Sequence, residues 1–435
     1  MYGAARSNFT KSLIMDKFLI KGPCKVKGTV NISGSKNASL PILAATILFD
    51  EPVEIKNLPN VKDIDTMLAL IKSLGFGVKT NKKKNSVLIK KNKNINTFAS
   101  YSLVKTMRAG ILVLGPLVSK FKKAKTSLPG GCLIGARPIN YHLNALKKLG
   151  MNYRIEKGYV HAFVKSKLNG SCITFPKISV GATENAILAA TLANGKTTLK
   201  NCAIEPEIKK DLTNFLNKAG ASIRWIGKRT VEINGVKKLK KISYSVMGDR
   251  IECGTFCVAA AISQGNLKIK GFDPKLINTE LNLLKKVGAK IKIDQNLISI
   301  IGPKKIKNIK FIKTREYDGF PTDLQAQFMT LLCKATGKSI ISESIFENRF
   351  MHVAELRRLG AKIIIKKNNA IIFGGTNFQG AELMSSDLRA SVALVLATIV
   401  ANGKSVINRI YHLDRGYEKI EKKLRSIGVN IKRLS

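Results

Sequence analysis

A short motif recurs six times along this 435-residue chain and restricts the folds it can adopt. In each copy an amphipathic stretch ends in an apolar residue and a glycine, and a strand-like run follows. The glycines are Gly75, Gly150, Gly220, Gly288, Gly360 and Gly428, spaced 75, 70, 68, 72 and 68 residues apart. Such periodicity indicates repeated copies of one supersecondary unit. We expect each glycine to end a helix in the left-handed conformation, which glycine adopts without strain.

An earlier helix, apolar nearly all round, is predicted in these units. The clearest examples are residues 37–49, 182–195, 251–265, 324–337 and 388–403. Helices without a polar face are buried rather than laid on a surface. Short strand-like runs such as TTLKN and LKIKG lie between the two helices of a unit. The predicted unit is therefore helix, strand, helix, strand, strand, with the apolar helices inside and the sheets outside.

Six units predict an α/β fold of two inside-out domains with three units each, because 435 residues exceed one ordinary core. We expect the first domain at 36–247 and the second at 15–35 plus 248–435, so the N-terminal strands cross between domains. Residues 1–14 are expected to be an N-terminal extension, either disordered or not native, since Met15 could equally be the start. Two lobes joined by two strands would form a cleft that closes on ligands.

Composition narrows the class of protein. The chain is 45% apolar, yet no apolar run approaches the roughly 20 residues that span a bilayer. The first residues lack the apolar stretch of a signal peptide, so we expect a cytoplasmic protein without a membrane partner. Seven scattered cysteines without CxxC spacing indicate reduced thiols and no zinc site. We also expect no cofactor, because the sequence contains no phosphate-binding or dinucleotide loop motif.

The formal net charge of +47 allows three interpretations. It is a solvated surface of biased composition, a nucleic acid binding surface, or a field that steers a polyanionic substrate. The lysine runs at 82–84, 237–241 and 304–310 have almost no aromatic residues between them to stack on bases. We therefore favour the biased surface and expect no nucleic acid partner.

The segment from Ser127 to Leu143, SLPGGCLIGARPINYHL, contains the most informative cysteine. Cys132 lies among glycines in a predicted loop, with Arg137 five residues on. A thiol in an electropositive loop can ionise and act as an acid or a nucleophile. The alternative is an inert buried cysteine, for which a Gly-Gly-Cys turn is a poor place.

Basic residues in compact polar contexts form a second group of candidates. Lys36 and Asn37 lie in a turn before the first apolar helix, where they could bind a phosphate or carboxylate or simply cap the helix. Arginine suits planar recognition of such anions. The candidate arginines are Arg108, Arg349, Arg389 and Arg415. Their alternative role is inter-repeat ion pairing with Asp387, Asp414 or Glu347.

Three acidic sites complete the candidates. Asp323 begins a predicted helix, where it is either an N-cap or a general base toward a sugar hydroxyl. Asp387 lies beside Arg389, and Asp249 lies near Glu252 in GDRIECGTF. Without a metal cluster or a Ser-His-Asp arrangement, cofactor-free group transfer fits these residues best.

Nine motifs in order resemble the family of UDP-N-acetylglucosamine 1-carboxyvinyltransferases, within the enolpyruvyl transferase superfamily. They are GSKNASLP, VKTMRAG, LPGGCLIGARP, SVGAT, GDRIECGTF, FPTDLQAQF, FENRFMH, DLRAS and HLDRGYE. The resemblance covers about Met15 to Ser435. It implies two inside-out α/β domains of three repeats each. It also implies transfer of the enolpyruvyl group of phosphoenolpyruvate to the 3-hydroxyl of UDP-N-acetylglucosamine, the first committed step of peptidoglycan precursor synthesis, by a monomer without a cofactor.

The resemblance also implies a role for each matching residue. Cys132 is the proton donor and forms a covalent adduct, Asp323 is the general base, and Asn37 contacts the tetrahedral intermediate. Phosphoenolpyruvate would be bound by Lys36, Arg108, Arg137 and Arg415. The remaining implied substrate contacts are Pro138, Ile139, Asn140, Tyr141, His142, Lys177, Ser179, Val180, Gly181, Asp249, Glu252, Ile345, Arg349, Asp387 and Arg389.

Cys132, where some members of the family carry aspartate, implies sensitivity to the epoxide inhibitor fosfomycin. Two departures from the family pattern, Cys253 and Glu184, touch none of the named roles. The nearest rival is the sister activity toward shikimate 3-phosphate, whose loop lacks the PGGC cysteine. A basic nucleic acid binding protein is the rival from another class.

Overall fold

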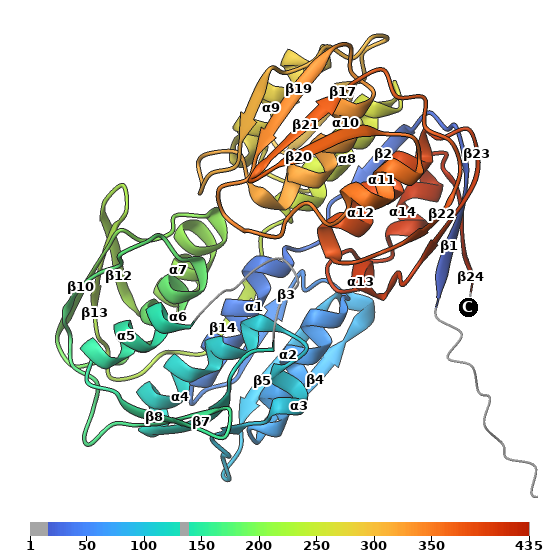
Figure 1. Ribbon diagram of the computed structural model, residues 1–435. Coiled ribbons are helices and arrows are strands. Elements are labelled where there is room, and N and C mark those ends of the chain that lie inside the picture. The colour runs from blue at the N-terminus through green and yellow to red at the C-terminus, as the bar shows by residue number, and fades with distance from the viewer. Residues whose placement is uncertain (1–15, 131–138, 435) are drawn as a thin grey trace, which may run out of the picture.

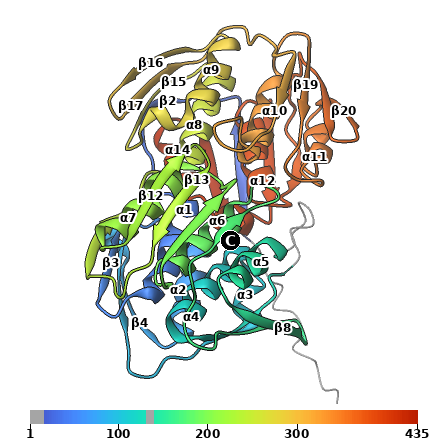
Figure 2. The ribbon, with the colours of Figure 1, turned by 90° about the vertical axis from the view of Figure 1, so that its left-hand side faces the viewer.

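We describe a computed structural model of the chain, and the description covers residues 16–130 and 139–434. Two hydrophobic cores divide these residues. One core takes its buried side chains from positions 38–246, and the other from 18–32 and 251–431. We call the corresponding parts the first lobe and the second lobe. Figures 1 and 2 show them as two bodies, with the N-terminal strands in blue among the yellow, orange and red elements of the second lobe.

The first lobe contains three repeat units. Its strands are β3 (Val53–Lys56), β4 (Phe76–Asn81), β5 (Ser86–Lys91), β6 (Phe98–Ala99), β7 (Lys123–Ser127), β8 (Asn152–Glu156), β9 (Tyr159–Phe163), β10 (Cys172–Thr174), β11 (Lys196–Lys200), β12 (Ser222–Gly227), β13 (Thr230–Asn234) and β14 (Ile242–Ser245). Its α-helices are α1 (Lys36–Ala45), α2 (Lys62–Ser73), α3 (Tyr101–Val104), α4 (Leu114–Phe121), α5 (Asn140–Lys148), α6 (Val180–Ala190) and α7 (Thr213–Lys218). Shorter helical segments are η1 (Thr46–Leu48), η2 (Lys82–Lys84), η3 (Arg108–Val113) and the π-helical η4 (Glu207–Leu212).

The second lobe repeats the pattern. Its strands are β1 (Lys17–Gly22), β2 (Lys27–Asn31), β15 (Asn266–Lys270), β16 (Lys290–Asp294), β17 (Leu297–Ile301), β18 (Phe311–Lys313), β19 (Lys338–Ser342), β20 (Lys362–Lys366), β21 (Asn369–Phe373), β22 (Glu382–Met384), β23 (Gly403–Asn408) and β24 (Asn430–Leu434). Its helical segments are α8 (Arg250–Ile262), η5 (Pro274–Ile277), α9 (Asn278–Lys286), η6 (Thr322–Leu324), α10 (Gln325–Cys333), α11 (Val353–Arg358), α12 (Leu388–Ile399), α13 (Tyr411–Asp414) and α14 (Ile420–Ser426).

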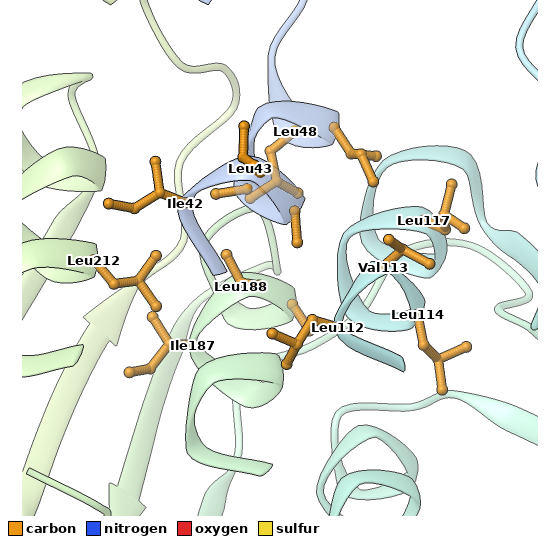
Figure 3. Packing of buried hydrophobic residues seen from close by; sticks show 14 of the residues in the cluster. Ile42, Leu43, Leu48, Leu112, Val113, Leu114, Leu117, Ile187, Leu188 and Leu212 are labelled. Atoms are coloured by element: carbon orange, nitrogen blue, oxygen red, sulfur yellow. The ribbon is translucent and has the colours of Figure 1, made fainter. Parts of the chain in front are cut away.

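The apolar helices lie inside the lobes, as the sequence predicts. Every residue of α8, α10 and α12 is buried. In the first lobe, Figure 3 shows side chains from α1, α4 and α6 packed together, among them Leu43, Leu117 and Leu188. The sheets cover this core from outside, with side chains alternating between buried and exposed along strands such as β13 and β15. The fold is therefore the predicted inside-out α/β arrangement.

The six repeated glycines adopt the predicted conformation. Gly75, Gly150, Gly220, Gly288, Gly360 and Gly428 all have φ between 93° and 103°. An L side chain is strained at such angles, so the repeat signal in the sequence is a backbone requirement. The buried helix of the second unit was not among the five apolar segments predicted. It begins as the 3₁₀ segment η3 and continues as α4, and Gly110, Gly115 and Pro116 interrupt its helical pattern.

Within the described residues the strands form six four-stranded sheets, one more strand per unit than the sequence predicts. The additional strand is β2, β6, β10, β14, β18 or β22, and it pairs in parallel with the strand that follows the buried helix. These edge strands are only two to five residues long. Strand β2 falls within the N-terminal strands predicted at 15–35, whereas the other five are runs so short that they have no readable alternation, which is why the sequence pattern missed them.

Two extended segments join the lobes side by side. Ser35 N–H donates to the Met247 carbonyl (2.7 Å), and Asp249 N–H donates to the Ser33 carbonyl (2.9 Å). A Cβ at Gly34 would lie 1.7 Å from the Asn57 carbonyl oxygen, so no larger residue fits there. Strand β1 pairs with β23 and β24, and β2 pairs with β15, which ties the N-terminus to the second lobe. The domain bounds of 36–247 and of 15–35 plus 248–435 stay a proposal, and residues 1–15 and 435 lie outside the described residues.

No helix within the described ranges is both long enough and apolar enough to cross a membrane.

Candidate active site

Asp323 lies between two buried arginines of the second lobe. Its Oδ1 accepts from Arg349 Nη2 (2.8 Å) and its Oδ2 accepts from Arg389 Nη2 (2.8 Å). Asp323 belongs to η6, Arg389 to the first turn of α12, and Arg349 to the turn before α11. The two arginine side chains are only 6% exposed, whereas that of Asp323 is 28% exposed. Three segments far apart in sequence thus meet at one carboxylate.

The N-cap interpretation of Asp323 is wrong, because Asp323 lies inside η6, whose N-cap is Pro321, and the N-cap of α10 is Leu324. Burial by itself would raise the pKa of this carboxyl. Arg389 and Arg349, with a contribution from Lys36, outweigh burial and hold its pKa well below the usual range. In this arrangement Asp323 is ionised at any physiological pH.

A second carboxylate, Asp63, joins basic residues of the two lobes. Its Oδ2 lies 3.3 Å from Lys36 Nζ, and its Oδ1 lies 3.0 Å from Arg415 Nε. Asp63 is in the first turn of α2, Lys36 begins α1, and Arg415 follows α13 in the second lobe. The Asp63 side chain is buried. Sequence reasoning missed this residue, because an acidic residue in the first turn of a helix is ordinary.

The turn at Lys36 is fixed by both lobes. Ser35 caps α1 by accepting from Ala38 N–H, so the cap falls one residue earlier than the predicted pair Lys36 and Asn37. Lys36 N–H donates to Asp249 Oδ2 (3.2 Å). Asp249 is itself the N-cap of α8 and accepts from the N–H groups of its first turn. The Lys36 side chain is thereby directed at Asp63 instead of capping the helix.

The two carboxylates and their cations act on one another. Burial is the largest influence on Lys36 and lowers its pKa. Asp63 and Asp323 oppose that effect, whereas Arg389 and Arg415 add to it. The cluster contains four cations, Lys36, Arg349, Arg389 and Arg415, and the two carboxylates that pair with them neutralise only part of that charge. Such a cluster favours an anion with phosphate or carboxylate groups.

Ion pairing of the arginines, the alternative to anion recognition, occurs but with other partners. That alternative named Asp387, Asp414 and Glu347 as the acceptors. Instead Arg349 and Arg389 pair with Asp323, and Arg415 pairs with Asp63. Asp387 caps α12 through the N–H groups of Arg389 and Ala390, and Asp414 pairs with Arg433. Local sequence proximity was therefore a poor guide to these partners.

His142 and Gly181 bring two predicted binding segments together in the first lobe. A Cβ at Gly181, in α6, would lie 3.0 Å from His142 Cε1, in α5. His142 Nδ1 lies 3.1 Å from Asn185 Nδ2, and Asn185 Oδ1 accepts from Gly115 N–H (2.8 Å). Burial and the nearby Arg108 lower the pKa of His142 to about 3, so its ring is neutral.

The other predicted contacts occupy varied positions. Ser179 caps α6, with Lys177 and Val180 exposed beside it, and Asn140 and Tyr141 begin α5 after the buried Ile139. Glu252 accepts from Ser33 N–H and pairs with Lys423 at 2.7 Å, whereas Ile345 N–H donates to Glu343. Their roles toward substrates stay predictions. Cys132, Arg137 and Pro138 lie outside the described residues.

The chain is similar to known proteins over nearly its whole length. The profile of a family described as EPSP synthase (3-phosphoshikimate 1-carboxyvinyltransferase) matches residues 20–424. The UDP-N-acetylglucosamine 1-carboxyvinyltransferase of Pelagibacter ubique is 63% identical over 421 residues, covering 97% of this chain and 100% of that protein. The protein of the same name from Acinetobacter baylyi is 48% identical over 97% of this chain and 100% of its own length.

A solved structure of similar fold is the enolpyruvyl transferase NikO from Streptomyces tendae. It has a TM-score of 0.86 at 22% identity and covers 96% of this chain and 99% of that one. The family profile and the high identity to relatives named as 1-carboxyvinyltransferases define the class of protein as a transferase of carboxyvinyl groups. The chain belongs to the EPSP synthase family.

Proposed function

We propose that this enzyme transfers the enolpyruvyl group of phosphoenolpyruvate to the 3-hydroxyl of UDP-N-acetylglucosamine and releases phosphate. This reaction would be the first committed step of peptidoglycan precursor synthesis. The observation that carries the proposal is the cluster of Lys36, Arg349, Arg389 and Arg415 around two carboxylates. The choice of acceptor is supported by the 63% identity to a protein named for that sugar nucleotide.

In the proposed reaction the substrate's methylene carbon accepts a proton from Cys132, and C2 becomes electrophilic. The sugar 3-oxygen attacks C2 while Asp323 takes the hydroxyl proton. The Cys132 thiolate would then take a proton back from the new methyl group, which expels phosphate and restores the double bond. The phosphate charge would be stabilised by Lys36, Arg108, Arg137 and Arg415. The closed arrangement would be stabilised by Arg349 and Arg389. Such fixed charges contribute several kcal/mol when water is excluded.

The ion pairs of Asp323 bear on its proposed role. A carboxylate held far below its usual pKa is a weak base, whereas an efficient base has a pKa near the working pH. An anionic substrate bound at Lys36 and the arginines would neutralise part of the positive field. The pKa of Asp323 would then rise, so that donor binding strengthens the base when it is needed.

The remaining substrate contacts are proposed on the same basis. Asn37 would contact the tetrahedral intermediate, and His142 and Gly181 would line the nucleotide site with Lys177, Ser179 and Val180. Two segments of the first lobe converge there, which supports a shared site. We further propose a cytoplasmic monomer that does not bind nucleic acid. Salt-dependent retention on DNA that persists after the lysine runs are replaced would contradict the last point.

The decisive experiment supplies phosphoenolpyruvate with either UDP-N-acetylglucosamine or shikimate 3-phosphate, the acceptor named for the matched family. Released phosphate and product mass are recorded. We expect phosphate with enolpyruvyl-UDP-N-acetylglucosamine only. Turnover with shikimate 3-phosphate alone, or with neither acceptor, would overturn the proposal.

Fosfomycin tests the proposed Cys132 separately. The inhibitor should add to that thiol and abolish turnover, and phosphoenolpyruvate should protect against it. Cys172 is an exposed cysteine outside the Cys132 loop, so Cys172→Ser is the matched control. This variant should remain sensitive to fosfomycin. An intact Cys132 thiol after incubation with the drug would contradict the assignment.

A further inference from the structure

Asp63 differs from its neighbour Asp65 in a way that a helix-dipole role does not explain. Both lie in the first turn of α2, where a carboxylate interacts favourably with the helix N-terminus. The Asp65 side chain is 49% exposed, and its Oδ1 lies 4.0 Å from Lys82 Nζ. The Asp63 side chain is 6% exposed and contacts cations from both lobes, through one oxygen each. Burying an ionised carboxylate is costly unless it is paired, so these contacts fix its place.

The two cations at Asp63 come from opposite sides of the site. Lys36 begins the first buried helix of the first lobe, and Arg415 follows α13 of the second lobe. Two like charges aimed at the same region repel each other, and a carboxylate between them offsets that repulsion. A second contact between the lobes lies beside this one, where Asn60 Nδ2 donates to Glu418 Oε1 (3.0 Å). Asp63 thus helps to determine the distance between two anion-binding groups that no single lobe contains.

We propose that Asp63 is a positioning residue for the transfer reaction: it holds Lys36 and Arg415 at the spacing that receives the anionic groups of the donor. The inference rests on the proposed function, but it concerns donor binding and not the choice of acceptor. Asp63 itself need not touch the substrate. Misplacing groups of this kind by about 1 Å can lower a rate roughly 100-fold.

The protonation of Lys36 makes donor binding depend on pH. A merely structural role of Asp63 would leave that pH dependence unchanged. The charged side chains that act on the Lys36 ammonium are Asp63, Asp323, Arg389 and Arg415, and Asp249 contacts the Lys36 backbone N–H. Burial, Arg389 and Arg415 lower the pKa of Lys36, and the two carboxylates oppose them. Loss of the Asp63 charge removes one of the opposing effects, so Lys36 would lose its proton at lower pH. Donor binding, which needs the ammonium form, would then fail at a lower pH than in the parent enzyme.

The test compares Asp63→Asn with Asp65→Asn, a matched change in the same helical turn. Binding of phosphoenolpyruvate is measured by calorimetry, and kcat/KM for the donor by phosphate release, both across pH. We expect Asp63→Asn to lower kcat/KM roughly 10- to 100-fold and to move the alkaline limb of both profiles to lower pH. Asp65→Asn should match the parent. Equal profiles for the two variants would overturn the proposal.

Asp63→Glu covers the case in which the asparagine variant does not fold. It keeps the charge but displaces it, so we expect a lowered kcat/KM with the parent's alkaline limb. An unchanged kcat/KM in this variant, or an alkaline limb displaced toward lower pH, would contradict positioning by a charged Asp63. Failure of the proposed function looks different: the parent would not turn over UDP-N-acetylglucosamine, while donor binding could still be compared among the variants.

Discussion

Two ionic clusters connect regions of the two lobes, and they have opposite charge ratios. At the candidate active site, four cations surround Asp63 and Asp323. Near the link between the lobes, Arg250 of α8 pairs with Glu207 of η4 at 2.9 Å and also interacts with Glu205 and Glu280. Here three carboxylates share one guanidinium, and both partners of the ion pair are at most 7% exposed.

The charge ratio determines what each cluster takes up. Excess cations hold the pKa of Asp323 far below normal, and their remaining positive charge favours the binding of an anion. Excess carboxylates in a buried place give the opposite result, because burial raises the pKa of Glu280 to about 7 and also raises that of Glu205. The first cluster therefore favours an anionic ligand, and the second favours bound protons. Burial alone does not distinguish a binding site from a structural contact; the balance of charge does.

Removing the central carboxylate of the first cluster should have the largest effect. Asp323→Asn deletes the proposed base, so kcat should fall by about 10²- to 10⁴-fold. The field becomes more positive, so KM for phosphoenolpyruvate should not rise. Steady-state phosphate release measures both values. Asp318→Asn is the control, since Asp318 is exposed and pairs with Lys228 at 3.6 Å. A kcat within fivefold of the parent would show that Asp323 is not the base.

Removing the only cation we place in the second cluster should affect stability instead of turnover. Arg250→Met leaves several buried carboxylates without their partner, and breaking a buried pair costs about 3–5 kcal/mol. Denaturant unfolding measures this loss. The exposed Arg224 pairs with Glu232, so Arg224→Met should change the free energy of unfolding by less than about 1 kcal/mol. Equal stabilities of the two variants would mean that the buried pair contributes nothing.

The smallest effect concerns the pH dependence of the second cluster. Glu280 has a pKa of about 7 in the folded state, against an ordinary value of 4.5. Between these two pH values the native state keeps a proton that the unfolded state has released. The resulting stability is present below pH 4.5 and is lost as pH rises to 7. Glu280→Gln should remove this slope and gain up to about 3 kcal/mol relative to the parent at neutral pH. Parallel stability curves from pH 5 to 8 would refute the shifted pKa.

Much of the fold could be predicted from the sequence, because it depends on the conformational preferences and hydrophobic patterns of short segments. The six glycines signalled positive φ, and the all-round apolar helices signalled burial, and both expectations are confirmed. The edge strands other than β2 and the interrupted helix at η3 and α4 were missed, since short or broken segments have no periodicity to read. Within the candidate site, Lys36, Asp323, Arg349, Arg389 and Arg415 were named from their motifs, and the structure brings them together.

The sequence by itself determined the repeat, the residue types available for anion binding, and the resemblance to a family of transferases. Only the tertiary structure decided which charges meet. Asp323 was predicted beside no particular arginine, yet it receives two of them from different segments, and Asp63 was not predicted at all. Asp63 and Arg415 are 352 residues apart and come together at the boundary of the lobes. Motifs record the chemistry of a side chain, whereas the partners of a buried charge follow from the packing of distant units, which no local pattern encodes.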